Sequence, residues 1–216
     1  MTYLLLTPVI LVVYLCKQDR HDAILSAAAD IALHEGLAAT TVRRVSTAAH
    51  TAVGQVHHHF SSASALRAEA YKLVMKNLQQ ELVASSCHLS ALERLQLYLI
   101  DPQHEKYLEA IRLWREAMIL TEQDELMRTA FASSLSDWHG LVKEVIEAGK
   151  TAEEFILEDS TDDIAWRLIG LSSSMDGMSR LASLGLTPER VAYNLNRAID
   201  IELRLSTSSQ PRECMT

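Results

Sequence analysis

The residues best suited to chemistry lie between Thr40 and Phe60, in the run TTVRRVSTAAHTAVGQVHHHF. Arginine, glutamine and histidine side chains, which are concentrated here, are the groups that contact phosphates and base edges in nucleic acids. The run is typical of two short helices joined by a tight turn, so a DNA-reading helix-turn-helix is the first hypothesis. The candidate contact residues are Thr40, Thr41, Arg43, Arg44, Ala52, Val53, Gln55, His57 and His58.

Several of these side chains also have a plainer interpretation. Gln55 can bind an adenine edge or reach only a phosphate, and Arg43 and Arg44 fit a solvated helix face as well as phosphate contacts. The triplet His57-His58-His59 does not predict a metal site, because successive helical residues point about 100° apart and no ligand pair at i,i+4 spacing accompanies it. We expect the third histidine near the core and the first two in contact with DNA or solvent.

Sequence motifs for catalysis are missing. The chain has no nucleotide-binding glycine loop, no nucleophile elbow and no HExxH motif. Its acidic pairs, Glu153-Glu154 and Asp162-Asp163, occur where a loop or a helix start is expected. We therefore predict that the protein is not an enzyme and needs no cofactor and no metal.

Short helices must position the candidate contact residues. From Asp19 to Glu35, apolar residues recur at spacings of three and four, which predicts one buried stripe on a helix that ends at Gly36. Thr40 is expected to cap a second helix with Val45 on its inner face. A third helix is predicted from about residue 53 to 59, with Phe60 packing behind it.

Composition predicts an all-α fold. Hydrophobic residues make up 48% of the 216 residues, which is enough for a sizeable core, and only 7 Gly and 4 Pro interrupt the chain. Alternating runs of β-branched and aromatic residues are nearly absent. We expect an N-terminal three-helix helix-turn-helix DNA-binding domain and a larger C-terminal helical domain for ligand binding and dimerisation.

Charge and cysteine content limit the partners and the compartment. The formal net charge is -8, but residues 17–67 hold five Lys or Arg against four acids, so the rest of the chain is strongly acidic. A near-neutral module that can approach phosphates and an acidic body kept away from them would fit this division. Three cysteines, Cys16, Cys87 and Cys214, follow no metal or disulfide spacing and indicate a reducing, cytoplasmic location.

The first 16 residues contain the apolar run YLLLTPVILVVYL. This run is too short for a membrane-spanning helix and lacks the flanking residues of a secretory signal. We interpret residues 1–16 as an apolar N-terminal arm or as a mis-assigned start, and we expect no membrane partner.

The residues from Arg20 to Leu66 resemble the N-terminal signature of TetR-type bacterial regulators. The matching positions are Ile24-Leu25, Ala27-Ala28, Gly36, the run from Ala39 to Val42, Val45, Ala49, Gly54, His58-His59-Phe60 and Leu66. The resemblance implies an all-helical homodimer whose helix near 53–59 enters the major groove of a double-stranded DNA operator. It also implies a variable C-terminal domain that binds a small-molecule effector.

The chain departs from this pattern at positions that matter for binding. His50, Thr51 and Ala52 stand where the family usually has Gly, Val and Ser, His57 replaces a Tyr that touches the DNA backbone, and Ala63 replaces a phosphate-contacting Lys. His50 must then adopt a conformation that is easiest for Gly. With two phosphate contacts weakened, we expect modest DNA affinity, a shallow salt dependence and a pH dependence from the imidazoles.

Helical spacing continues through the rest of the chain. A long helix is expected from Leu66 to about Val83, followed by helices at 91–100, 104–120 and 124–148, a loop at 149–160, and helices at 162–184 and 188–205. We expect the last two to pair with a second copy in a four-helix bundle, and the alternative is that they form one monomer's core. Aromatic and other large side chains in the middle helices are expected to pack in the core or to line the effector pocket, and those candidates are Trp114, Met118, Phe131, Trp138 and His139.

The predicted domains are the helix-turn-helix at 17–66, the effector-binding and dimerisation domain at 67–206 and a disordered tail at 207–216. The expected function is a ligand-responsive DNA-binding transcriptional regulator, a repressor released from its operator by a small, mainly apolar molecule. The alternative is a helical interaction module with a degenerate helix-turn-helix and no specific operator.

Overall fold

The computed structural model describes residues 17–100 and 105–204, and these residues contain helices and no strand. The helices are α1 (Lys17–Glu35), α2 (Val42–Ala48), α3 (Val53–His59), α4 (Ala63–Ser86), α5 (Ala91–Leu99), α6 (Glu105–Leu120), α7 (Glu125–Thr151), α8 (Thr161–Ser179) and α9 (Pro188–Leu203), with a 3₁₀ turn η1 (Ala182–Leu184) before α9. The all-α prediction is confirmed. The apolar arm 1–16 and the tail 207–216 lie outside the described residues.

Side-chain caps explain where most of these helices begin. Thr41, Ser62, Ser90, Asp124, Ser160 and Thr187 each accept a hydrogen bond from a backbone amide in the first turn of the following helix. Ser62 starts α4 at Ala63, three residues before the start predicted at Leu66. The first turn of α5 is further closed by a capping box, in which Glu93 accepts the amide of Ser90 in return.

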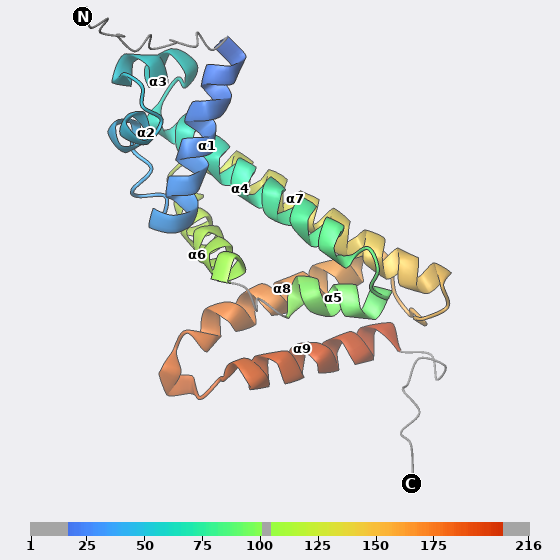
Figure 1. The fold of residues 1–216 in the computed structure, drawn as a ribbon. Coiled ribbons are helices and arrows are strands. Elements are labelled where there is room, and N and C mark those ends of the chain that lie inside the picture. Colours follow the sequence, from blue (N-terminus) through green and yellow to red (C-terminus); the bar gives the residue numbers. More distant parts are fainter. Residues whose placement is uncertain (1–16, 101–104, 205–216) are drawn as a thin grey trace, which may run out of the picture.

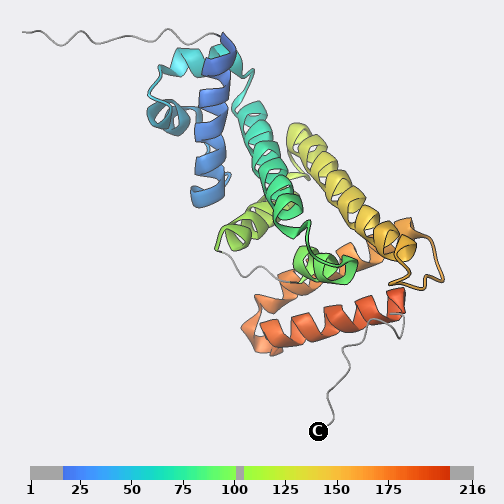
Figure 2. The ribbon, with the colours of Figure 1, turned by 45° about the vertical axis from the view of Figure 1, so that its right-hand side comes forward.

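Two long helices connect the ends of the molecule. α4 and α7 pack side by side along most of their length, as Figures 1 and 2 show from two directions. The helices α1, α2 and α3 form a head at one end, and α5, α8 and α9 gather at the other end. α6 lies on the head side and contacts both α1 and α4.

Buried side chains form two hydrophobic clusters. The first joins the head to α4, α6 and the start of α7, and Ile24, Val45, Leu66 and Leu113 are fully buried in it. The second joins α5, the end of α7, α8 and α9. Because the first cluster includes residues of α6 and α7, the head is packed firmly against the body instead of hanging from it by a linker.

The last two helices correct a prediction about packing. The apolar faces expected to meet a second copy lie within the chain's own core, and their buried members are Ile164, Leu168, Met175, Leu195, Ile199 and Leu203. α8 and α9 pack on each other with these faces, so the faces belong to the chain's own core, and the pairing of the two helices with a second copy stays a prediction. The opposite faces carry large exposed side chains, among them Trp166, Tyr193 and Ile201.

The loop after α7 also differs slightly from the prediction. The helix runs on through Gly149 to Thr151, because Gly149 leaves space for the ring of Phe155. A Cβ at position 149 would lie 2.1 Å from Cε2 of that ring. Among the described helices, none has the length and apolar character needed to cross a membrane.

Candidate nucleic-acid interface

Inward-facing side chains hold the helices of the head together as predicted. Val45 of α2 and Val56 of α3 are fully buried, and Phe60 packs behind α3 with almost no exposed surface. α1 ends at Glu35, and the next residue, Gly36, has a φ of 93°, which is accessible to glycine at little cost. The helical spacing read from the sequence therefore identified the correct core of the head.

The turn between α2 and α3 contains the predicted strain. His50 has a φ of 49°, the left-handed conformation that usually favours glycine. Its amide bonds to the carbonyl of Thr47 at 3.3 Å, and the amide of Thr51 bonds to Ser46 O at 2.9 Å. The turn thus closes with backbone hydrogen bonds even though its central residue is a histidine.

Thr41 caps α2, and the prediction that Thr40 does so is wrong. Thr41 accepts the amide of Arg44 at 3.2 Å, whereas the hydroxyl of Thr40 donates to Gly36 O at 3.1 Å. Thr40 has 0% of its surface exposed, so its side chain is not available to DNA. Thr41 is exposed and remains a candidate contact residue.

The two arginines of α2 differ in their freedom. Arg44 donates from Nε and Nη2 to the carboxylate of Glu35, at 3.2 and 2.6 Å. This bond lowers the pKa of Glu35 and raises the pKa of Arg44. Arg43 is exposed, and in residues 17–100 and 105–204 its guanidinium has no ion pair. Arg43 is therefore the freer candidate for a phosphate contact.

α3 presents its candidate contact residues on its outer surface. Ala52, Val53, His57 and His58 are exposed, and Gln55 is half-buried. Ala52 supplies no side-chain cap, as expected for a residue without an oxygen. Gly54 is also exposed, and a Cβ built there would meet no other atom within 4 Å. The protein itself therefore does not require a glycine at this position.

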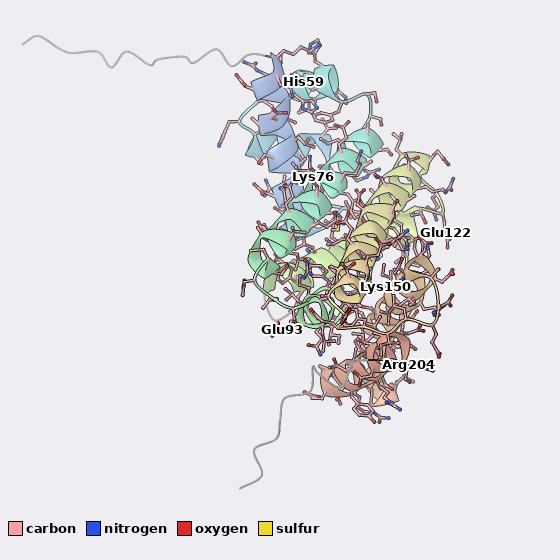
Figure 3. The ribbon with its side chains drawn as sticks, turned by 90° about the vertical axis from the view of Figure 1, so that its right-hand side faces the viewer. His59, Lys76, Glu93, Glu122, Lys150 and Arg204 are labelled. Carbon is pink, nitrogen blue, oxygen red and sulfur yellow. The ribbon has the colours of Figure 1, made fainter. Side chains whose placement is uncertain are left out.

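His59 belongs to a ring cluster that sequence reasoning missed. His21 of α1 stacks on Phe60 with ring centroids 4.9 Å apart, and His59 lies edge-on to His21 at 5.9 Å and to His58 at 5.4 Å. Partial burial, followed by the neighbouring histidines and cations, lowers the pKa of His59. Figure 3 places it at the head end of the molecule. Helical spacing could not reveal this cluster, because its partners come from separate helices.

The described residues contain no cluster of histidine, cysteine and acidic side chains suited to a metal ion. The histidine rings of the head contact each other and Phe60 through their faces and edges, which is a packing arrangement.

Three of the five candidate effector residues come together. Trp114 of α6 packs against Phe131 at 4.4 Å and edge-on against Trp138 at 5.5 Å, both on α7. Met118 is instead 58% exposed. His139 faces α8, where it stacks on Trp166 at 4.1 Å. The five residues therefore do not line one site.

A buried hydroxyl adjoins this aromatic group. Tyr71 of α4 has no exposed surface and stacks near Phe131, with ring centroids 6.3 Å apart. No hydrogen bond of ordinary geometry engages its oxygen in the part of the chain that the structure describes, although the side chain of Ser134 lies close enough to lower its pKa, an effect smaller than that of burial. Burial raises the pKa of this phenol, so it stays protonated and able to donate.

Comparisons with known proteins agree with this architecture. Residues 24–70 match the family model described as bacterial regulatory proteins of the tetR family. The comparison with curated proteins gives no match.

Solved structures extend the likeness beyond the head. A TetR-family transcriptional regulator from Cytophaga hutchinsonii superimposes with a TM-score of 0.74 at 19% identity, covering 89% of this chain and 99% of that one. A TetR transcription regulator from Haloarcula marismortui gives 0.68 at 15% identity, with 86% and 99% covered. E. coli NemR in its reduced form gives 0.65 at 15% identity, with 85% and 98% covered.

The sequence match and the structural likeness cover different parts of the chain. The sequence match covers α3 and the start of α4, and the structural likeness extends to the C-terminal helices. Together they show that residues 24–70 are similar to the tetR family model and that the described chain shares the fold of solved TetR-family regulators.

Proposed function

We propose that the protein is a repressor that binds a DNA operator as a homodimer and leaves it when a small, mainly apolar effector binds. In this proposal residues 17–66 read the DNA, and residues 67–206 bind the effector and dimerise. The observation that supports it is the outer surface of α3, where the exposed side chains of His57 and His58 lie beside Gly54, at which a Cβ would meet no other atom within 4 Å.

Gly54 is the most informative position on that surface. Gly54 is the second residue of α3, and no neighbouring atom requires a glycine there. Glycine is favoured where a backbone approaches another molecule closely. A major groove that receives α3 supplies such a molecule, with Gln55, His57 and His58 as the side chains that reach it.

The positive charge on this surface is small, which bears on the affinity. Arg44 is held by Glu35, and Arg43 is the arginine of α2 that is left for phosphates. Because each phosphate contact releases counterions, few contacts imply a shallow salt dependence. We therefore propose operator binding of modest affinity that strengthens when exposed imidazoles are protonated.

The proposed homodimer uses the exposed faces of α8 and α9. Trp166, Tyr193 and Ile201 are 44%, 70% and 60% exposed, although they are large and apolar or amphipathic. Gly170 lies exposed on the same helix as Trp166, where it would allow another helix to approach closely. Large apolar side chains left exposed on neighbouring helices are typical of protein interfaces.

The effector site is proposed at Tyr71 and the aromatic group beside it. A buried hydroxyl without a partner is costly, and a ligand oxygen or nitrogen would satisfy it. Trp114, Phe131 and Trp138 would supply apolar contact area for the rest of the ligand. Since Tyr71 and Trp114 also border the core shared with the head, a ligand here would alter the packing beneath the head.

Footprinting on the DNA that flanks the protein's own gene tests the proposal. A specific footprint supports a regulator, whereas uniform weak binding favours a helical interaction module. The double variant His57→Ala/His58→Ala should lose about tenfold or more in affinity for the protected site. His88→Ala, an exposed histidine at the α4–α5 turn, is the matched control and should bind as the parent does.

A further inference from the structure

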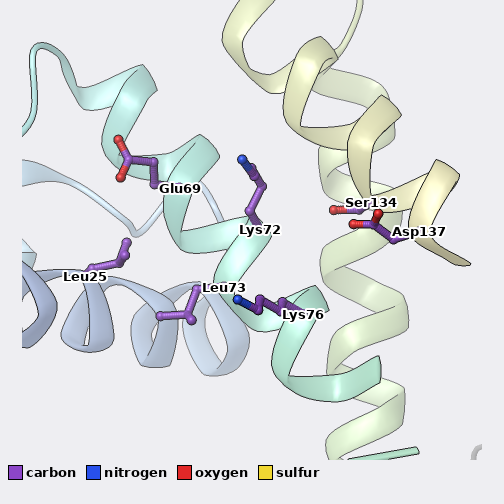
Figure 4. A pocket seen from close by; sticks show the side chains of 7 residues that line it. All are labelled: Leu25, Glu69, Lys72, Leu73, Lys76, Ser134 and Asp137. Carbon is purple, nitrogen blue, oxygen red and sulfur yellow. The ribbon is translucent and has the colours of Figure 1, made fainter. Parts of the chain in front are cut away.

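A groove lies between α1, α4 and α7, and none of the aromatic residues of the proposed effector site lines it. Its volume is about 250 Å³, and it is bordered by α1 on one side and α7 on the other. Leu25 and Leu73 form its apolar part, and Lys72 and Lys76 extend from successive turns of α4 (Figure 4). Ligand sites for drug-sized molecules measure about 300–1,000 Å³, so this groove suits a smaller metabolite.

The charged groups of the groove are separated instead of paired. Within residues 17–100 and 105–204, no ion pair or hydrogen bond engages the ammonium groups of Lys72 and Lys76 or the carboxylate of Asp137. Glu69 lies further along α4, with an oxygen 3.6 Å from Nε2 of His21. Two neighbouring lysines repel each other, so a bound anion would relieve that repulsion.

The opposite charge stands across the groove on α7. Asp137 and the hydroxyl-bearing Ser134 belong to this helix, whereas both lysines belong to α4. The formal charges of the groove sum to zero, so a purely anionic ligand is attracted by the lysines and repelled by the acids. A purely cationic ligand is attracted by the acids and repelled by the lysines. A molecule with one charge of each sign can be attracted at both sides.

We propose that this groove binds a small zwitterion, an amino-carboxylate whose two charged ends are separated by a short hydrocarbon chain. Its carboxylate lies between Lys72 and Lys76, and its ammonium group meets Asp137 beside Ser134. The hydrocarbon chain spans the gap from α4 to α7, and Leu25 and Leu73 lie on the other side of the lysines (Figure 4). Packed helices lie about 8–10 Å apart, a separation that a short ω-amino acid spans better than an α-amino acid does.

The location of the groove gives the ligand a route to DNA binding. Both lysines belong to α4, which follows the head directly, whereas Ser134 and Asp137 belong to α7. A ligand that bridges the lysines to Asp137 binds best to one relative position of α4 and α7 and shifts the population towards it. This regulatory consequence rests on the proposed function, whereas binding in the groove does not.

Calorimetric titration of the full chain with three probes tests the site. The probes are 6-aminohexanoate, hexanoate and hexylammonium, which share the hydrocarbon chain and differ in their charged ends. We expect 6-aminohexanoate to bind at least about tenfold more tightly than either singly charged probe. Equal binding of all three, or no binding of 6-aminohexanoate, overturns the proposal.

Variants locate the binding. Lys72→Gln/Lys76→Gln should lower the affinity for 6-aminohexanoate at least about tenfold. Asp137→Asn should also lower the affinity for 6-aminohexanoate, and it should raise the affinity for hexanoate. Lys150→Gln, at the far end of α7 (Figure 3), is the control and should change nothing. Binding that survives the double lysine variant refutes the site. The operator footprint of the ligand-free chain tests the proposed function separately, so either idea can fail alone.

Discussion

Glu116 of α6 forms a hydrogen bond with the backbone just after the end of α1. Its Oε2 accepts the amide of Leu37 at 2.8 Å, and Leu37 itself is buried. Arg112, one turn earlier on α6, donates to Leu33 O at 2.5 Å. α6 therefore supplies hydrogen-bond partners to backbone groups at the C-terminus of α1. We predict that Glu116→Ala destabilises the protein and loosens the head.

The expected size of this effect follows from the bond. A hydrogen bond to a charged group contributes about 1.5–3 kcal/mol, and its loss leaves the amide of Leu37 without a partner. We expect Glu116→Ala to lower the free energy of unfolding by about 2 kcal/mol, which corresponds to about 4–8 °C in Tm for a protein of this size. Glu116→Gln keeps a neutral acceptor, so it should cost about half as much.

Thermal unfolding followed by circular dichroism measures the effect. Glu122→Ala, an exposed residue in the turn after α6 (Figure 3), is the control and should melt with the parent. Gly36 offers a coupled test, because a Cβ there would lie 2.8 Å from Oε2 of Glu116. Gly36→Ala should lower Tm more when it is introduced into the parent protein than when it is introduced into the Glu116→Ala variant. If Glu116→Ala has the same Tm as Glu122→Ala, the hydrogen bond between Glu116 and Leu37 does not stabilise the protein, which contradicts the prediction.

Three further predictions concern stability. Thr41→Ala removes the cap of α2 and should cost about 1 kcal/mol in chemical denaturation. Gly149→Ala pushes a methyl group into Phe155 and should cost about 1–3 kcal/mol in the free energy of unfolding, whereas Gly140→Ala on the same helix, with open space around it, should not destabilise the protein. The lowered pKa of His59 means that the unfolded chain binds a proton more readily. Stability should therefore fall as pH falls below about 6.5, and His59→Gln should flatten that part of the pH–stability curve.

Local interactions made the helices predictable. The periodicity from Asp19 to Glu35 and the capping residues Ser90 and Thr187 involve side chains and backbone within one or two turns. The turn between α2 and α3 is also determined locally, because the left-handed conformation of His50 follows from its place between two short helices. These features were read correctly from the sequence because neighbours in the chain determine them.

Locality also explains the small errors. Thr40 and Thr41 are adjacent hydroxyl residues before the same helix, and the sequence does not show which one turns towards the amides. The structure turns Thr40 inward to Gly36 and leaves Thr41 to cap α2.

The sequence by itself determined that the chain is helical, where most helices begin and end, and that its head carries a DNA-reading pattern. Only the tertiary structure decided which neighbour each apolar face meets. The faces of α8 and α9 predicted to meet a second copy turn into the monomer core, and His139 turns away from Trp114. The groove between Lys72 and Asp137 likewise depends on α4 and α7 lying side by side. Helical spacing identifies an apolar face, but the relative orientation of distant helices decides its partner.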